Sequence, residues 1–164
     1  MSLRQFATAA AAVSILAWSA AAASAATIVN VDLWDSGASA QMMTGLEYTG
    51  TGPVDLSKAT MGVKISQATA PRGVVTFKVT NSSKDTVHEM IVLYLKDPNT
   101  PPPYSASDQR IDEDKAGYKG EVSELQPGKT GNKTLALQPG KYLLVCNIAG
   151  HYAAGMWTEF DVTQ

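Results

Sequence analysis

Three side chains that can bind a soft metal ion lie close together near the C-terminal end of the sequence. Cys146 is the only cysteine of the chain, and His151 and Met156 follow it at intervals of five residues within VCNIAGHYAAGM. Thiolates and thioethers are soft ligands, and imidazole binds copper, zinc and iron. A single loop of this size can turn all three side chains towards one point, so the spacing indicates a metal site.

His88, the second of only two histidines, is the candidate fourth ligand. It follows the turn-forming cluster NSSKD and stands near the start of the apolar run VHEMIVLYL. If this strand begins beside the cysteine loop, the donor set becomes two imidazoles, a thiolate and a thioether. Structural zinc sites usually take four Cys or His ligands, and iron–sulfur clusters need several cysteines. Two histidines, one cysteine and a weak axial methionine are typical of blue-copper centres, so we predict one copper ion that alternates between Cu(I) and Cu(II).

Each of these residues also has a simpler explanation when it is taken alone. A single cysteine is often a small core residue, and a methionine that begins a strand usually packs in the core. A lone histidine is more often a surface or hydrogen-bonded residue. The metal site is favoured because both histidines and the only cysteine fall where one copper ion would need them.

The N-terminus has the pattern of an export signal. Arg4 precedes an alanine-rich apolar run that ends in Ala23-Ser24-Ala25, the small residues that signal peptidase prefers. We predict a signal peptide over residues 1–25, a mature domain over residues 26–164 and a periplasmic location; a membrane anchor is the alternative. In an oxidising compartment a free thiol must be buried or occupied, which agrees with metal binding by Cys146.

The charge of the chain argues against nucleic acid as a partner. The sequence has 13 basic and 15 acidic residues, and the loss of Arg4 with the signal peptide would leave 12 and 15, a net charge of −3. Nucleic-acid binding requires a basic face. After cleavage no stretch is long and apolar enough to insert stably in a membrane.

Alternating apolar residues and turn signals predict an all-β domain. Proline and glycine in the repeated sequence LQPGK, at 125–129 and 137–141, suit type II turns. Residues 36–60 and 97–120 are expected to be long loops, the first with one helical turn near Ala40. Many short strands with little helical periodicity indicate a single antiparallel β-sandwich or barrel. The expected strands cover residues 27–33, 61–66, 73–80, 87–95, 133–137, 142–146 and 157–162.

The stretch YLLVCNIAGHYAAGM, followed by WTEFDV, resembles the C-terminal copper loop of the cupredoxins, the type 1 blue copper proteins. The Cys-x4-His-x4-Met spacing is similar to that of rusticyanin-like and sulfocyanin-like members, and VHEMIVL resembles the segment with the first histidine ligand. The resemblance implies a Greek-key β-sandwich. It also implies that His88, Cys146 and His151 form a trigonal plane, with Met156 as the long axial ligand.

One residue departs from the common pattern of that family. Many cupredoxins have Asn or Ser after the first histidine, where this chain has Glu89. Its carboxylate could accept a backbone N–H from the cysteine loop and lower the reduction potential, or it could be a solvated charge. Asn147 is a second candidate for orienting the loop.

The resemblance implies a single-domain, one-electron carrier rather than an enzyme. Both histidines would already bind one copper ion, so none remains for a catalytic site. A cytochrome or a copper enzyme is the expected partner, docking at the 147–156 loop, whose small residues would form a low apolar patch around an exposed His151 edge. Tyr152 and Trp157 belong either to that patch or to the core. The alternative function is copper handling or resistance, with Met42, Met43 and Met61 as a loose Cu(I) site.

Overall fold

A computed structural model describes residues 26–164 of the chain. The predicted signal peptide, residues 1–25, lies outside this described part. Within residues 26–164, no helix is both long enough and apolar enough to cross a membrane.

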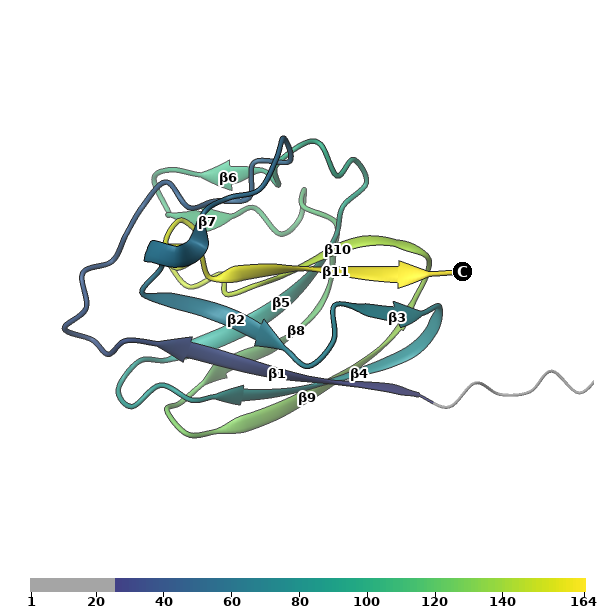
Figure 1. Cartoon of the computed structure of the whole chain (residues 1–164), viewed down its shortest axis with the longest axis horizontal. Coiled ribbons are helices and arrows are strands. Elements are labelled where there is room, and N and C mark those ends of the chain that lie inside the picture. Colours follow the sequence, from purple (N-terminus) through teal and green to yellow (C-terminus); the bar gives the residue numbers. More distant parts are fainter. Residues whose placement is uncertain (1–25) are drawn as a thin grey trace, which may run out of the picture.

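Two β-sheets pack face to face and form the body of the molecule (Figure 1). The first sheet has the strand order β2-β1-β4-β9. Its strands are β1 (Thr27–Asp35), β2 (Met61–Ile65), β4 (Gly73–Asn81) and β9 (Thr130–Leu137). β1 runs antiparallel to β2 but parallel to β4, so the sheet is mixed.

The second sheet carries the cysteine loop and has the strand order β3-β11-β10-β5-β8. Its central strands, β5 and β10, run antiparallel to each other. A separate pair, β6 and β7, lies beyond this sheet (Figure 1). The bounds are β3 (Thr69–Pro71), β5 (His88–Tyr94), β8 (Tyr118–Leu125), β10 (Gly140–Val145), β11 (Trp157–Thr163), β6 (Tyr104–Ser105) and β7 (Arg110–Ile111).

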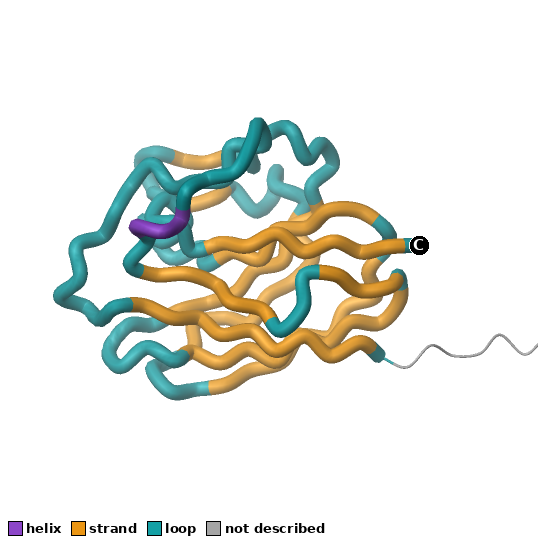
Figure 2. Tube along the Cα trace, in the orientation of Figure 1, coloured by secondary structure: helices purple, strands orange, loops and turns teal. Residues whose placement is uncertain are grey.

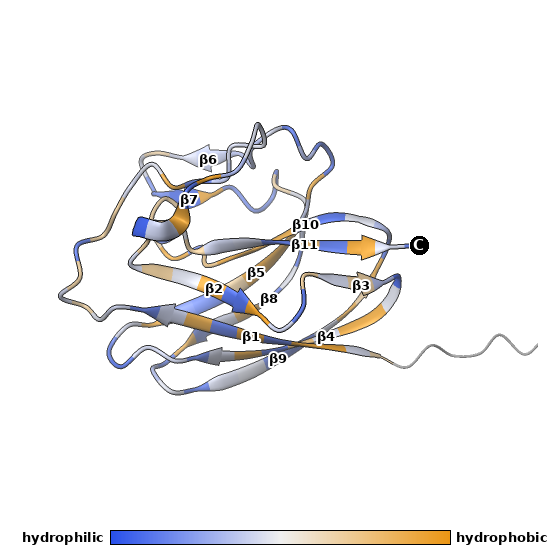
Figure 3. Ribbon diagram, in the orientation of Figure 1, coloured by the Kyte–Doolittle hydropathy of each residue, from blue (hydrophilic) through white to orange (hydrophobic). Residues whose placement is uncertain are grey.

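Apolar side chains pack on both faces of the second sheet. The core between the two sheets includes Val75, Phe77 and Val79 of β4, which alternate with more exposed residues as the sequence predicted. A second cluster on the outer face includes Ile91, Leu143 and Val145. β5 and β10 are therefore buried on both faces and are apolar along most of their length (Figure 3).

Two long segments, residues 36–60 and 97–117, cover this outer face, and we call them the covering segments. Apart from the short pair β6–β7 and a 3₁₀ helix, η1 (Leu56–Lys58), they are loops (Figure 2). Tyr48 and Ile111 from these segments are buried against the sheet. The layer they form closes over the end of the sandwich that carries the cysteine loop.

The all-β sandwich predicted from the sequence is confirmed, with differences in detail. The seven expected strands all form, but β3, β6, β7 and β8 were not anticipated. The helical turn forms at Leu56–Lys58, whereas near Ala40 there is a reverse turn closed by a bond from its N–H to Gly37 O. The sheets are mixed rather than purely antiparallel because β1 pairs in parallel with β4, and β3 with β11.

The two Pro-Gly turns also differ from each other. Gly128 has φ +72°, and the N–H of Lys129 bonds to Gln126 O, in agreement with the expected type II turn. Gly140 has φ +146° and already begins β10, so the same local sequence adopts another geometry there.

Candidate metal centre

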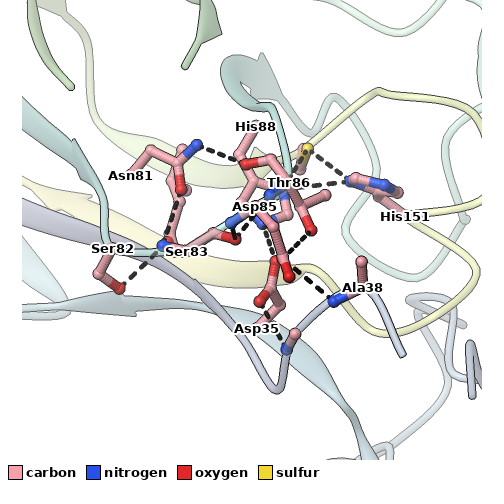
Figure 4. Close-up of polar contacts among 12 residues, drawn as sticks. Asp35, Ala38, Asn81, Ser82, Ser83, Asp85, Thr86, His88 and His151 are labelled. Atoms are coloured by element: carbon pink, nitrogen blue, oxygen red, sulfur yellow. Dashed lines mark hydrogen bonds and ion pairs between the residues drawn. The ribbon is translucent and has the colours of Figure 1, made fainter. Parts of the chain in front are cut away.

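Donor atoms of His88, Cys146 and His151 converge on one buried point. All three lie within 4.8 Å of one another. Cys146 Sγ lies 3.3 Å from Nδ1 of His151 and 3.8 Å from Nδ1 of His88, and the two Nδ1 atoms are 3.3 Å apart. Figure 4 shows both imidazoles directed at the sulfur atom. A soft thiolate and two imidazole nitrogens thus share one small volume.

The cysteine loop is folded by its own backbone bonds. The N–H of Cys146 donates to Met156 O, and the N–H of Met156 donates to His151 O, both at 3.0 Å. Gly150 and Gly155 have φ of +83° and +91°, values that side-chain-bearing residues rarely adopt. The loop therefore returns on itself, so that residues ten positions apart in the sequence become neighbours. Met156 is fully buried in the same core cluster as Cys146.

His88 is positioned by an aspartate from another strand. Nε2 of His88 lies 2.9 Å from Oδ2 of Asp35, the last residue of β1, and both side chains are buried (Figure 4). A carboxylate only accepts hydrogen bonds, so the Nε2 atom carries the proton and Nδ1 keeps its lone pair. The sequence analysis missed Asp35, because it lies 53 positions from His88 and nothing local marks the contact.

Asn81 fixes the turn that leads into His88. Its amide nitrogen donates to Thr86 O and Leu125 O, both at 2.8 Å, and its side-chain oxygen accepts the N–H of Ser83 at 2.9 Å. The side chain is completely buried. This bracing sets where β5 begins, and hence where the imidazole of His88 lies.

The two residues next to the candidate ligands act differently from each other. The sequence analysis offered two roles for the Glu89 carboxylate, a bond to the cysteine loop or a solvated charge. In the structure the contact with the cysteine is instead made by the main chain, because the backbone N–H of Glu89 donates to Cys146 Sγ at 3.5 Å. Asn147 does orient the loop, as predicted. Its side chain accepts the N–H of Ile111 at 2.7 Å and donates to Ile111 O at 3.1 Å.

Burial sets the protonation of the donor groups in the metal-free protein. It raises the pKa of the Cys146 thiol to about 12, even though N–H groups of Glu89 and Ile148 act in the opposite direction. Burial and the neighbouring His88 lower the pKa of His151 to about 4. Burial also lowers the pKa of His88, against the opposing effect of Asp35. At neutral pH both imidazoles are therefore uncharged and able to bind a metal ion, whereas the thiol still carries its proton.

Two nearby carboxyl groups are shifted in opposite directions. Burial raises the pKa of Glu89 to about 7, although Arg110 acts against this rise. Burial also acts to raise the pKa of Asp35, but hydrogen bonds, including those of Ser83, Gly37 and His88, outweigh it and lower the pKa. Asp35 is accordingly the anionic partner of the site at neutral pH.

Most of the cysteine loop is buried, so the prediction of an exposed apolar patch of small residues is wrong. Gly150, Ala153, Ala154 and Gly155 are all buried, and only Ala149 is well exposed. His151 retains 5 % of its accessible surface. The covering segments bury the cysteine loop. Four hydrogen bonds hold these segments against it: Leu46 N–H to Ala153 O, Gly150 N–H to Gln109 O, Trp157 Nε1–H to Leu46 O, and Tyr152 Oη–H to Tyr48 O.

The same cover places Tyr152 and Trp157 in the core rather than on a docking face. They are 1 % and 8 % exposed, and the ring of Trp157 packs edge-on against Tyr48 at 5.3 Å between centroids. His151 lines a small cleft of about 200 Å³. Its lining includes Met42, Met61, Thr86 and Asp35.

The donor set fits copper on its own chemistry. Two neutral imidazoles, a buried thiol that a metal ion can deprotonate, and a buried thioether nearby are ligands that both Cu(I) and Cu(II) accept. Fewer than four strong Cys or His donors meet here, which disfavours a structural zinc site. The residues that the sequence pattern selected are therefore brought together as a copper ion would require.

Comparison with known proteins agrees with this chemistry. The family model described as the Sulfocyanin (SoxE) domain matches residues 46–164. A crystal structure of dithionite-reduced auracyanin from Roseiflexus castenholzii shares the fold, with a TM-score of 0.51 and 19 % identity, over 85 % of this chain and 98 % of that one. Rusticyanin from Thiobacillus ferrooxidans gives a TM-score of 0.52 and 20 % identity, over 85 % and 79 %. The chain therefore belongs to the sulfocyanins, within the cupredoxin family of blue copper proteins, which bind one copper ion and typically carry electrons.

Proposed function

We propose that this protein is an exported one-electron carrier whose copper ion is held by His88, Cys146, His151 and Met156. The observation that supports it best is the convergence of three donor atoms within 4.8 Å at a buried point. The bound copper ion would supply the electron by changing between Cu(I) and Cu(II). His88, Cys146 and His151 would be the strong ligands, and the buried Met156 thioether would be a weaker fourth ligand.

The surroundings of the donors suit rapid electron transfer, because they limit rearrangement. Asp35, the Glu89 N–H and the Asn147 side chain hold the groups in place before any metal arrives. Side chains held by such contacts need to move little when the charge of the metal changes. The covering segments keep His151 nearly buried, which limits the access of water and of external ligands.

A carrier is favoured over an enzyme by the ligand count. The chain has two histidines, and both belong to this one site. Four protein ligands would leave no open position for a substrate. We therefore assign electron transfer and no catalysis to the centre.

Export and partner choice are part of the same proposal. Residues 1–25 would be removed as a signal peptide, and residues 26–164 would work as one cupredoxin domain in the periplasm. The partner would be a redox protein such as a cytochrome or a copper enzyme. It would dock over the exposed Ala149 and the cleft beside His151, rather than on a broad patch of small residues.

The first test is a Cu(II) titration of the mature protein, followed by visible absorption and EPR. An intense thiolate-to-copper band that saturates at one copper ion and bleaches with mild reductant is expected. Cys146→Ala should abolish the band while the protein stays folded by circular dichroism. A protein that binds copper without this band would not have Cys146 as a ligand, and the assignment would fail.

Copper handling is the second candidate, because the structure places two methionines beside the site. Met42 and Met61 line the same cleft as His151, and Met42 is 45 % exposed. Thioethers bind Cu(I), so the cleft could pass copper to or from the centre. A carrier should retain copper in both oxidation states against a Cu(I) chelator. Rapid transfer that slows markedly in Met42→Leu would favour handling instead.

A further inference from the structure

We infer that Asp35 is the positioning residue that fixes the tautomer of His88 and stabilises the oxidised state of the centre. This inference rests on the proposed function for its second part, the effect on the copper ion. Its first part, the tautomer of His88, concerns the metal-free protein and rests only on the contact between Asp35 and His88. No other carboxylate within the described residues forms a hydrogen bond with either histidine.

The contact between the two residues is short and shielded from water. Oδ2 of Asp35 lies 2.9 Å from Nε2 of His88, and their side chains are 4 % and 0 % exposed. A charged hydrogen bond at this distance is stronger than a neutral one, and burial removes competing water. His88 therefore cannot rotate or exchange its proton between nitrogens without losing this bond. Its Nδ1 lone pair stays directed at Cys146.

Asp35 is itself held by the loop that follows it. Its other oxygen, Oδ1, accepts the N–H of Gly37 at 2.8 Å. The N–H of Ala38 donates in turn to Oδ1 of Asp85, in the turn that precedes His88, at 3.1 Å (Figure 4). The bond between Ala38 and Asp85 thus joins the end of β1 to the turn before β5, in addition to the contact between Asp35 and His88.

The charge of Asp35 has a direct consequence for the metal. A carboxylate that accepts the remaining N–H of a ligating imidazole makes that imidazole a stronger donor. A stronger donor and a nearby negative charge both favour Cu(II) over Cu(I). Asp35, rather than Glu89, therefore supplies the principal electrostatic control of His88, since Glu89 contacts the cysteine through its backbone only.

Two variants separate the hydrogen bond from the charge. Asp35→Asn can still accept the Nε2 proton but has no charge, and Asp35→Leu removes both. Asp32→Asn is the matched control, because it makes the same charge change on the same strand. The side chain of Asp32 lies on the outer face of the sheet, away from the core. The two measurements are 15N NMR of the histidine tautomers in the metal-free protein and the reduction potential of the copper form.

The expected results differ among the variants. His88 should be a single Nε2-protonated tautomer in the wild type, in Asp32→Asn and in Asp35→Asn, and should become mixed or Nδ1-protonated in Asp35→Leu. The potential should rise in Asp35→Asn by clearly more than in Asp32→Asn. Cu(II) affinity should fall about 10- to 100-fold in Asp35→Leu.

Failure of this inference can be told apart from failure of the proposed function. If the wild type forms no type 1 spectrum, the proposed function fails, while the tautomer measurement still tests Asp35. An unchanged tautomer in a folded Asp35→Leu would overturn the positioning role. Equal potentials in Asp35→Asn and Asp32→Asn would overturn the electrostatic one. Should Asp35→Leu fail to fold, a wild-type His88 protonated at Nδ1 would overturn the positioning role by itself.

Discussion

The side chain of Asn147, the residue after the cysteine, binds both backbone groups of Ile111. Its oxygen accepts the Ile111 N–H at 2.7 Å, and its amide nitrogen donates to Ile111 O at 3.1 Å and to Glu113 Oε1 at 2.8 Å. A side chain of the cysteine loop thus makes the backbone hydrogen bonds with β7 that a neighbouring strand would otherwise make. This side chain joins the covering segment 97–117 to the metal site, in addition to the backbone bond from Gly150 N–H to Gln109 O.

Asn147→Ala should loosen this junction without removing a ligand. The buried N–H of Ile111 would lose its partner, which costs about 1–3 kcal/mol. We expect the unfolding free energy to fall by that amount and copper to leave the protein faster, while the thiolate-to-copper band persists. Chemical denaturation and chelator kinetics would measure both. Asn132→Ala, at an exposed position of β9, is the control and should change stability by less than about 0.5 kcal/mol.

Trp157→Phe should open the other covering segment, residues 36–60. The indole Nε1 donates to Leu46 O at 2.7 Å, and phenylalanine lacks this donor while keeping the aromatic contact with Tyr48. The loss is expected to cost about 1 kcal/mol and to raise hydrogen exchange in this segment. Copper should then transfer more rapidly to a chelator. Trp34→Phe, at a ring that packs under Lys64 on β2, serves as the control; equal rates in the two variants would contradict the role of the cover.

The stability of the metal-free protein should depend on pH mainly through His151 and Glu89, the two groups with large and opposite pKa shifts. His151 has a folded-state pKa of about 4. As the pH falls below about 6.5, the unfolded chain therefore binds a proton at this histidine, whereas the folded protein does not. This lowers stability by about 3 kcal/mol as the pH falls from 7 to 4. Glu89, with its pKa raised to about 7, holds a proton that the unfolded chain releases above pH 4.5. It therefore adds a similar amount of stability over the same fall in pH.

Glu89→Gln separates these two contributions. Between pH 7 and pH 4 the contributions of His151 and Glu89 should cancel in the wild-type protein without copper, which leaves only the smaller losses from His88 and Asp35. The variant should lose about 3 kcal/mol more than the wild type over that range, because the opposing contribution of Glu89 is gone. Urea denaturation at both pH values measures the difference. A variant whose stability stays constant would show that His151 is not buried in its neutral form.

Copper binding should release one proton, and it should come from Cys146. The thiol has a pKa of about 12 in the metal-free protein, whereas both imidazoles are already neutral. A metal ion that binds the thiolate must displace this proton, so the apparent Cu(I) affinity should rise about tenfold per pH unit between pH 7.5 and 9. Competition with a Cu(I) chelator measures the slope. A slope that persists in Cys146→Ala would assign the proton to another group.

Much of the fold could be predicted because its signals are local. Alternating apolar residues in β4 and the apolar runs of β5 and β10 identify strands whatever the rest of the chain does. β8 was missed because Gly120 and two glutamates interrupt its apolar pattern. The parallel pairing of β1 with β4 was missed because a strand pattern does not state its partner.

The sequence by itself determined the chemistry of the centre. Two histidines, one cysteine and the five-residue spacing to Met156 favour copper over zinc and iron, since donor type is a property of each residue. The convergence of His88, Cys146 and His151 within 4.8 Å agrees with that prediction. Only the tertiary structure decided how this chemistry is controlled. Asp35 reaches His88, and the covering segments bury His151, through contacts between residues far apart in the chain, which depend on packing and leave no mark in local sequence.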